Sequence, residues 1–290
     1  MKVGIIGAGS IAGTMAGTIR EMDCAQNYAV AARDYGRAAE FAQTYGFEKA
    51  YGSYEELVED AGVELVYIAT PHSHHYEHIK LCLNHGKHVL CEKSFTVNES
   101  QAREVLALAR EKKLLLTEAI WTRYMPMRKT LDSVLSSGVI GRPYMLTANL
   151  GYIISGKERI MRPELAGGAL LDVGIYPLNF ASMVFGDEVD SITGTAVMTE
   201  TGVDAQNSIT ITYKDGKMAA LCSSAMGLSD RRGIIYGDNG FIEVENINNC
   251  EGIRVYDRSR NMIASYDTPK QISGYESVSY THLTLPTNRE

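Results

Sequence analysis

Short apolar runs alternate with longer amphipathic stretches through the first 120 residues. The short runs have the length and β-branched content of strands, which we predict at residues 2–6, 28–32, 64–68, 87–91 and 114–117. The stretches between them have helical spacing of apolar residues, and we predict helices at 11–21, 37–45, 54–59, 75–84 and 100–111. Parallel strands need crossover connections, which this alternation supplies. We therefore predict an α/β fold with a doubly wound parallel sheet of the Rossmann type over residues 1–120.

The pattern changes after Trp121. Two helices are predicted at 126–137 and 172–185, and a strand at 144–152. Further short strands, separated by turn signals such as Asp238-Asn239-Gly240, are predicted at residues 192–198, 208–213, 218–224, 233–237, 240–245 and 254–257. Closely spaced strands of this kind pair mainly antiparallel. We predict an α+β second domain with a mostly antiparallel sheet over residues 121–277.

Composition restricts the partners of the protein. A chain of 290 residues suits two domains, and its net charge of −7 argues against nucleic-acid binding. Its apolar runs are shorter than the ~20 residues that span a bilayer, so no membrane segment is expected. The first strand leads directly into a glycine loop, which leaves no room for a secretory signal.

Five cysteines without a Cys-x-x-Cys pair indicate reduced thiols and no metal site. We expect a cytoplasmic protein.

A glycine loop directly follows the first predicted strand. It reads Gly7-Ala8-Gly9-Ser10-Ile11-Ala12 and opens an amphipathic helix. The first glycine allows a tight turn, the second lets a pyrophosphate approach the backbone, and the small third residue lets the helix pack on the strand. In its strand-helix-strand context the loop predicts a dinucleotide site. A methyltransferase loop for adenosylmethionine is the main alternative.

The end of the second strand indicates which dinucleotide is bound. There the chain reads Ala32-Arg33-Asp34. An arginine at this place favours the 2′-phosphate of NADP, because its planar guanidinium pairs with phosphate, whereas an acid favours the ribose hydroxyl of NAD. Arg33 makes NADP the expected cofactor, and Asp34 leaves NAD open.

Chemically active side chains follow the next two predicted strands. Residues 70–75 read Thr-Pro-His-Ser-His-His after one strand, and Glu92-Lys93 follows the other. The carboxyl ends of parallel strands meet at the edge of the sheet where ligands bind. We therefore expect these groups near the nicotinamide end of the cofactor.

The sequence resembles the glucose-fructose oxidoreductase / inositol dehydrogenase / MocA family. Within that family it resembles most the group of the dimeric dihydrodiol dehydrogenases and NADP-dependent D-xylose dehydrogenases. The resemblance extends from residue 2 to about 276. It rests on the glycine loop, on Ala69-Thr70-Pro71 with His75, on Glu92-Lys93, on residues 118–123 (Glu-Ala-Ile-Trp-Thr-Arg) and on residues 167–177 (Gly-Gly-Ala-Leu-Leu-Asp-Val-Gly-Ile-Tyr-Pro).

The resemblance implies a role for each matched residue. Lys93 would stabilise a developing alkoxide, Asp172 would contact substrate, and Tyr176 would be the general base. His75 and Trp121 match positions that line the substrate pocket. The residues expected at the cofactor are Gly7, Gly9, Ser10, Ile11, Arg33, Thr70, Pro71, His72, Glu92 and Lys93. The alternatives are purely structural roles, a core tyrosine for Tyr176 and an N-terminal helix cap for Asp172.

One position departs from the family pattern. The family usually has proline after the lysine, commonly with a cis peptide bond, whereas this chain has Ser94. A cis bond before a residue other than proline costs roughly 2.5–4 kcal/mol. We expect either a trans bond or a strained one here.

The sequence thus predicts an NADP-dependent dehydrogenase that transfers hydride between nicotinamide and a CH–OH group of a small molecule. Aldose oxidation to a lactone is the first expectation, and trans-dihydrodiol oxidation is the second. The alternatives are a keto-sugar or inositol reductase or dehydrogenase of the same family, and a non-catalytic NADP-binding sensor. The resemblance further implies a homodimer formed through the sheet of the second domain.

The last residues do not fit the family. Relatives continue beyond residue 276 into further helices, whereas residues 278–290 have no helical periodicity and resemble a read-through of a sequencing adaptor. We expect a non-native tail at 278–290.

Overall fold

The computed structural model describes residues 1–277, and their packing forms two compact units. The first unit contains residues 1–121 together with the described residues from 272 onward, and the second is Thr122–Gln271. Residues 272–277, predicted as part of the second domain, therefore pack with the first. The expectation for residues 278–290 lies outside the described residues.

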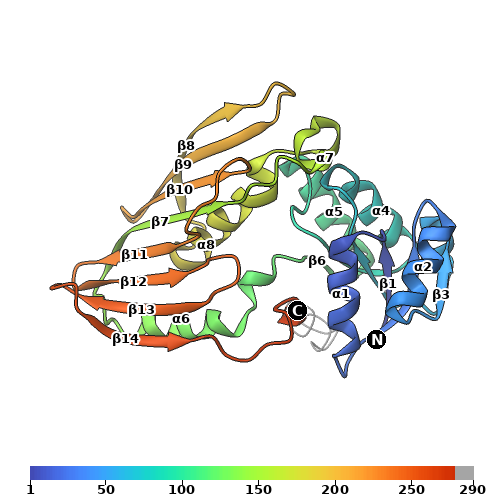
Figure 1. The fold of residues 1–290 in the computed structure, drawn as a ribbon, viewed down its shortest axis with the longest axis horizontal. Helices are drawn as coiled ribbons and strands as arrows, with labels where there is room; N and C mark the ends of the chain where they lie inside the picture. The colour runs from blue at the N-terminus through green and yellow to red at the C-terminus, as the bar shows by residue number, and fades with distance from the viewer. Residues whose placement is uncertain (278–290) are drawn as a thin grey trace. The chain divides into compact units, whose positions relative to one another are not determined.

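The first unit is a parallel sheet with helices on both faces (Figure 1). The strand order β3-β2-β1-β4-β5-β6 is that of a Rossmann fold, so the predicted fold class is confirmed. Its strands are β1 (Lys2–Ile6), β2 (Gln26–Ala31), β3 (Lys49–Tyr51), β4 (Leu65–Ile68), β5 (His88–Cys91) and β6 (Leu116–Glu118). Its helices are α1 (Ser10–Arg20), α2 (Tyr35–Tyr45), α3 (Tyr54–Glu59), α4 (His75–Asn84) and α5 (Glu99–Lys112).

Burial on both faces explains why the strands of this sheet are apolar runs without alternation. All four residues of β4 are buried, and so are Val3, Ile5 and Ile6 of β1. Side-chain caps fix where helices begin: Asp34 accepts a hydrogen bond from Arg37 N, and Ser53 forms a capping box with Glu56. These caps therefore fix where the loops after β2 and β3 end and α2 and α3 begin.

The second unit is an eight-stranded sheet in the order β14-β13-β12-β11-β7-β10-β9-β8. Only β7 and β10 pair parallel, so the prediction of a mostly antiparallel sheet is confirmed. The strands are β7 (Pro143–Gly151), β8 (Val189–Met198), β9 (Asp204–Tyr213), β10 (Met218–Ser224), β11 (Gly233–Gly237), β12 (Gly240–Glu245), β13 (Gly252–Asp257) and β14 (Met262–Asp267). The last of these was not predicted.

The helices of this unit are α6 (Pro126–Ser136), the short α7 (Glu158–Met161) and α8 (Ile175–Phe185). The predicted helix at 172–185 begins instead as a π-helical turn, Leu170–Gly174, which continues into α8. Helix α8 packs on β7 and β10, where the alternate residues Leu146, Leu221 and Ser223 are buried (Figure 1). The opposite side chains, such as Thr147, Ala220 and Thr210, form what we call the open face of the sheet.

One described stretch, Pro163–Phe185, is long and apolar enough to cross a membrane by length and composition alone. It is not one continuous helix, because Ala166 and Gly168 have φ angles of 52° and 102°. More than half of its apolar window, 56%, is buried within the protein. Such a stretch is typical of the core of a globular domain, and we assign it to the core of the second unit.

Candidate active site

The glycine loop has the geometry that a dinucleotide-binding turn requires. Gly7 follows β1 with φ of 103°, and a Cβ atom there would lie 2.8 Å from Ala69 O. Gly9 is the N-cap of α1 and has nothing within 4 Å of the place a Cβ would take. Ala12 is fully buried, which lets α1 approach the sheet. Backbone N–H groups at the start of α1 are thus available to a pyrophosphate.

Two arginines lie at or just before the start of α2, and one of them contacts the glycine loop. Arg33 is exposed, and the Arg37 guanidinium donates to Ala8 O over 3.1 Å. Burial raises the pKa of Tyr54, and Arg33 and Arg37 oppose this shift, so both cations lie near that hydroxyl. Asp34 accepts from Arg37 N over 2.8 Å as the helix cap. Arg37 was not predicted, although it lies one helical turn after Arg33.

Thr70, Pro71 and His72 follow β4 at the carboxyl edge, as predicted from their place in the sequence. His75 is fully buried there: its Nδ1 lies 2.8 Å from Ser94 O and its Nε2 lies 2.9 Å from Thr70 O. Burial lowers the pKa of His75. The imidazole ring of His75 thus links the chain after β4 to the chain after β5. The contact of His75 with substrate that the family resemblance implies stays a prediction.

Lys93 follows β5 at the same edge of the sheet. The residue before it, Glu92, is buried, accepts a short hydrogen bond from the Tyr67 hydroxyl, and accepts one from Lys93 N over 3.2 Å. Burial raises the pKa of Glu92 to about 7, and the Tyr67 bond opposes this shift. The burial and the Tyr67 bond show that the Glu92 side chain is directed into the protein, and the pairing with Tyr67 had no signal in the sequence. The Lys93–Ser94 peptide bond is cis.

Trp121 lies at the end of the first unit and is also buried. Its indole stacks on Tyr275, with ring centroids 4.5 Å apart and planes 10° apart. The segment around Tyr275 is held by Glu276, whose carboxylate accepts from the backbone N–H groups of Ile272, Ser273 and Gly274. The predicted substrate contact of Trp121 stays a prediction.

In the second unit, Asp172 and Tyr176 lie where the π-helical turn meets α8, and both are buried, with 5% and 7% of their surfaces exposed. The Asp172 carboxylate is paired with Arg159, at 2.8 Å between Nη1 and Oδ1. Arg159 lies on α7, and nothing in its spacing indicated this partner. A carboxylate paired with a guanidinium, and a phenol four residues after that carboxylate, thus lie near the start of one core helix.

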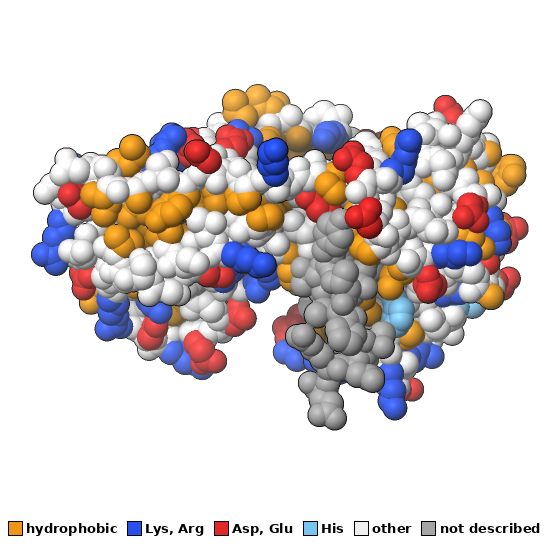
Figure 2. Space-filling model, turned by 90° about the horizontal axis from the view of Figure 1, so that it is seen from below, with side chains coloured by type: hydrophobic (Ala, Val, Ile, Leu, Met, Phe, Trp, Pro, Cys, Tyr) orange, Lys and Arg blue, Asp and Glu red, His pale blue; other side chains and the backbone are white. Residues whose placement is uncertain are grey.

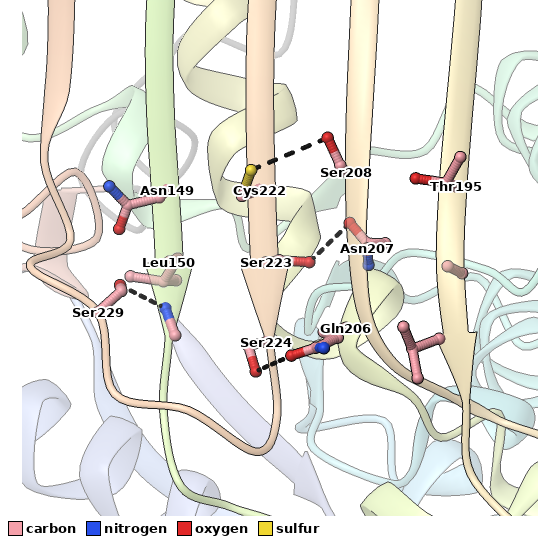
Figure 3. Close-up of a pocket in the computed structure, with 13 residues that line it drawn as sticks. Asn149, Leu150, Thr195, Gln206, Asn207, Ser208, Cys222, Ser223, Ser224 and Ser229 are labelled. Carbon is pink, nitrogen blue, oxygen red and sulfur yellow. Dashed lines mark hydrogen bonds between the residues drawn. The ribbon is translucent and has the colours of Figure 1, made fainter.

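A hollow of about 370 Å³ lies on the strands of the second unit, and the predicted site residues do not line it (Figure 3). Polar side chains of four strands border it, among them Asn149, Thr195, Ser208 and Cys222. These positions belong to the open face, on the side of the sheet opposite α8. Among residues 1–277, no group of three His, Cys, Asp or Glu side chains could hold a metal ion.

Family models match both halves of the chain. Residues 1–120 match an oxidoreductase family with an NAD-binding Rossmann fold, and residues 129–243 match the GFO/IDH/MocA C-terminal domain. The chain belongs to the Gfo/Idh/MocA oxidoreductase family. The predicted family, with an NAD(P)-dependent oxidoreductase as the class of enzyme, is thereby confirmed.

Curated members of the family are similar over most of the chain. Trans-1,2-dihydrobenzene-1,2-diol dehydrogenase of Xenopus tropicalis is 36% identical over 246 residues, which cover 84% of this chain and 74% of that protein. The Homo sapiens enzyme of the same name is 39% identical over 250 residues, 85% of this chain and 75% of that protein.

Solved structures share the fold. A 3-ketoreductase from Actinomadura kijaniata with NADP and TDP-benzene has a TM-score of 0.90 at 24% identity, covering 97% of this chain and 88% of that one. An aldose-aldose oxidoreductase from Caulobacter crescentus has a TM-score of 0.87 at 20% identity, covering 98% and 88%. At these identities the likeness is one of fold.

Proposed function

We propose that this protein is an NADP-dependent dehydrogenase that oxidises a CH–OH group of a cyclic trans-dihydrodiol or of an aldose. The observation that carries the proposal is Lys93 at the carboxyl end of β5, in the same unit and at the same sheet edge as the glycine loop. Ligands of doubly wound sheets bind at this edge. The similarity to dihydrodiol dehydrogenases supports the diol, and the family resemblance supports the sugar.

The chain's own residues have separate tasks in this reaction. A bound nicotinamide would supply the hydride acceptor for the carbinol carbon. Lys93 supplies positive charge that stabilises the substrate oxygen as its proton leaves. Tyr176 takes that proton as general base, and Asp172 binds and orients the substrate hydroxyl. The assignment of these tasks to Lys93, Asp172 and Tyr176 rests on the family resemblance.

NADP is proposed over NAD from the groups at the start of α2. The Arg37 guanidinium bonds to the glycine loop at Ala8 O, and Arg33 and Arg37 both act on Tyr54, so the start of α2 offers two guanidiniums that suit the dianionic 2′-phosphate. The Asp34 carboxylate that would bind the ribose hydroxyl of NAD already accepts from Arg37 N.

A homodimer through the open face is proposed as the assembled form. Tyr236, Phe241 and Tyr256 form a row of aromatic rings there, with Phe241 stacked on Tyr256 at 4.6 Å. Hydrophobic side chains gather on the second unit (Figure 2, left), and exposed apolar residues on the open face of its edge strands include Val197 and Met262. Contiguous exposed apolar surface marks interaction sites.

Lys93→Met tests the proposed function. We expect turnover of NADP with a panel of aldoses and trans-dihydrodiols to fall by about 100-fold or more, because removing one group that stabilises transition-state charge costs several kcal/mol. NADPH affinity, measured by nicotinamide fluorescence, should stay within about twofold. Lys112→Met, which removes an exposed lysine of α5, is the matched control. Unchanged turnover in Lys93→Met would refute the role of Lys93, and no turnover of any substrate by the wild-type protein would refute the proposed function.

A further inference from the structure

We infer that Arg159 is a positioning residue that fixes the charge and direction of the Asp172 carboxylate in the reaction. The inference rests on the proposed function, in which Asp172 binds substrate. The two side chains form an ion pair of 2.8 Å, with 7% of the Asp172 side chain exposed and 41% of that of Arg159. A carboxylate this buried is retained as a charge only when it is paired.

Two glycines allow α7 to reach the start of α8. A Cβ atom at Gly167 would lie 2.4 Å from Ile160 O and 2.8 Å from Arg159 O, both of them backbone atoms. Gly168 N donates to Ile160 O over 2.8 Å. The backbone of α7 thus lies directly against the Gly167-Gly168 turn, and this close approach places Arg159 beside Asp172.

The backbone around Asp172 is held by a different set of bonds. Asp204 at the start of β9 accepts from Leu170 N over 2.8 Å and from the Asn207 amide over 2.8 Å. Ser223 of β10 donates to Asn207 over 2.9 Å (Figure 3). Because this chain of bonds fixes the turn without Arg159, the contribution of Arg159 is specific to the side chain of Asp172.

The chemistry of the pair suits positioning. A guanidinium cannot be deprotonated in a protein, so it remains a cation beside the carboxylate, and the bond from Arg159 Nη1 to Asp172 Oδ1 directs the carboxylate. Without this bond the carboxylate would be held less firmly in its direction, and it would accept a hydrogen bond from substrate in a poorer geometry. The partly exposed surface of Arg159 leaves its remaining donors open to solvent.

The test is a double-mutant cycle with Arg159→Met and Asp172→Asn. We would measure kcat and KM of each variant with the substrate that the wild-type protein oxidises. We expect Arg159→Met to lower kcat/KM by about 10- to 100-fold, the range for a hydrogen bond to a charged group. In the Asp172→Asn background the same change should cost less than about threefold, because the partner through which Arg159 acts is already altered. Arg159→Lys should recover most of the loss, since an ammonium can also donate a single charged bond to the carboxylate.

The control is Arg162→Met, one turn further along, whose guanidinium pairs with the exposed Glu158. It should leave kcat/KM within about twofold, and NADPH affinity should be unchanged in every variant. Equal losses from Arg159→Met in both backgrounds would overturn the inference and indicate that Arg159 acts independently of Asp172. Loss without recovery in Arg159→Lys would also overturn it. If the wild-type protein turns over no sugar or diol, the proposed function fails and this inference fails with it.

Discussion

At the scale of single residues, the most consequential group that the sequence did not reveal is the buried pair of Glu92 and Tyr67. Glu92 was predicted as a cofactor contact from its place after β5 and from the match of Glu92-Lys93 to the family pattern, and neither indicated a buried partner. The pairing depends on Tyr67, 25 residues earlier, pointing to the same interior position. Burial thus raises the pKa of Glu92, next to the proposed catalytic lysine.

Glu92→Gln should change how stability depends on pH. Burial raises the pKa of Glu92 from 4.5 to about 7, so the folded protein binds this proton more tightly than the unfolded chain does. The wild-type protein therefore loses stability as pH rises from about 4.5 to about 7, by about 3 kcal/mol for this group. Glutamine does not titrate, and its variant should lack that loss.

The measurement is urea unfolding at several pH values, followed by the fluorescence of Trp121, the single tryptophan of the chain. Trp121 belongs to the same unit as Glu92 and reports on its unfolding. The exposed Glu111→Gln serves as the control. Parallel pH dependences in the wild-type protein and Glu92→Gln would show that Glu92 has the same pKa in the folded and unfolded states, and would refute the raised pKa.

At the scale of elements, the sequence was most informative where one local pattern decides the structure. Strand β1 was predicted at 2–6 and lies at Lys2–Ile6, because an apolar run followed by glycines has few other solutions. The start of α8 was less accurate, since its π-helical turn is held by Asp204, which is distant in sequence. The ion pair of Arg159 with Asp172 could not be predicted, because it depends on the close approach of α7 to the Gly167-Gly168 turn.

The start of α2 carries the prediction on cofactor choice. Arg37→Ala should weaken NADPH binding by about 10-fold or more, as expected for a lost charge-assisted bond to phosphate. NADH lacks that phosphate, so its affinity should change only through the lost bond of Arg37 to Ala8 O. Fluorescence titrations with both nucleotides separate the two effects, with Arg20→Ala on α1 as control. Equal weakening of NADPH and NADH would place Arg37 away from the 2′-phosphate.

At the scale of the whole molecule, the open face should govern assembly. Sedimentation equilibrium is expected to give a dimer for the wild-type protein and a monomer for Ala220→Arg, because unpaired charge buried at an interface is costly. Ala220 pairs with Thr147 and Thr210 in the middle of that face. Thr44→Arg on the surface of α2 should remain dimeric. A wild-type monomer at micromolar concentration would refute the proposed dimer.

The path of the chain between the two units has a consequence for synthesis. The second unit is one continuous stretch, whereas the first needs residues 272–277, where Tyr275 covers Trp121 and Ser273 meets Thr18 at 2.8 Å. Domains usually complete folding in the order in which the ribosome makes them. We therefore expect the Rossmann unit, whose synthesis starts first, to complete its folding last. The face of Trp121 stays uncovered during translation of the about 150 residues of the second unit.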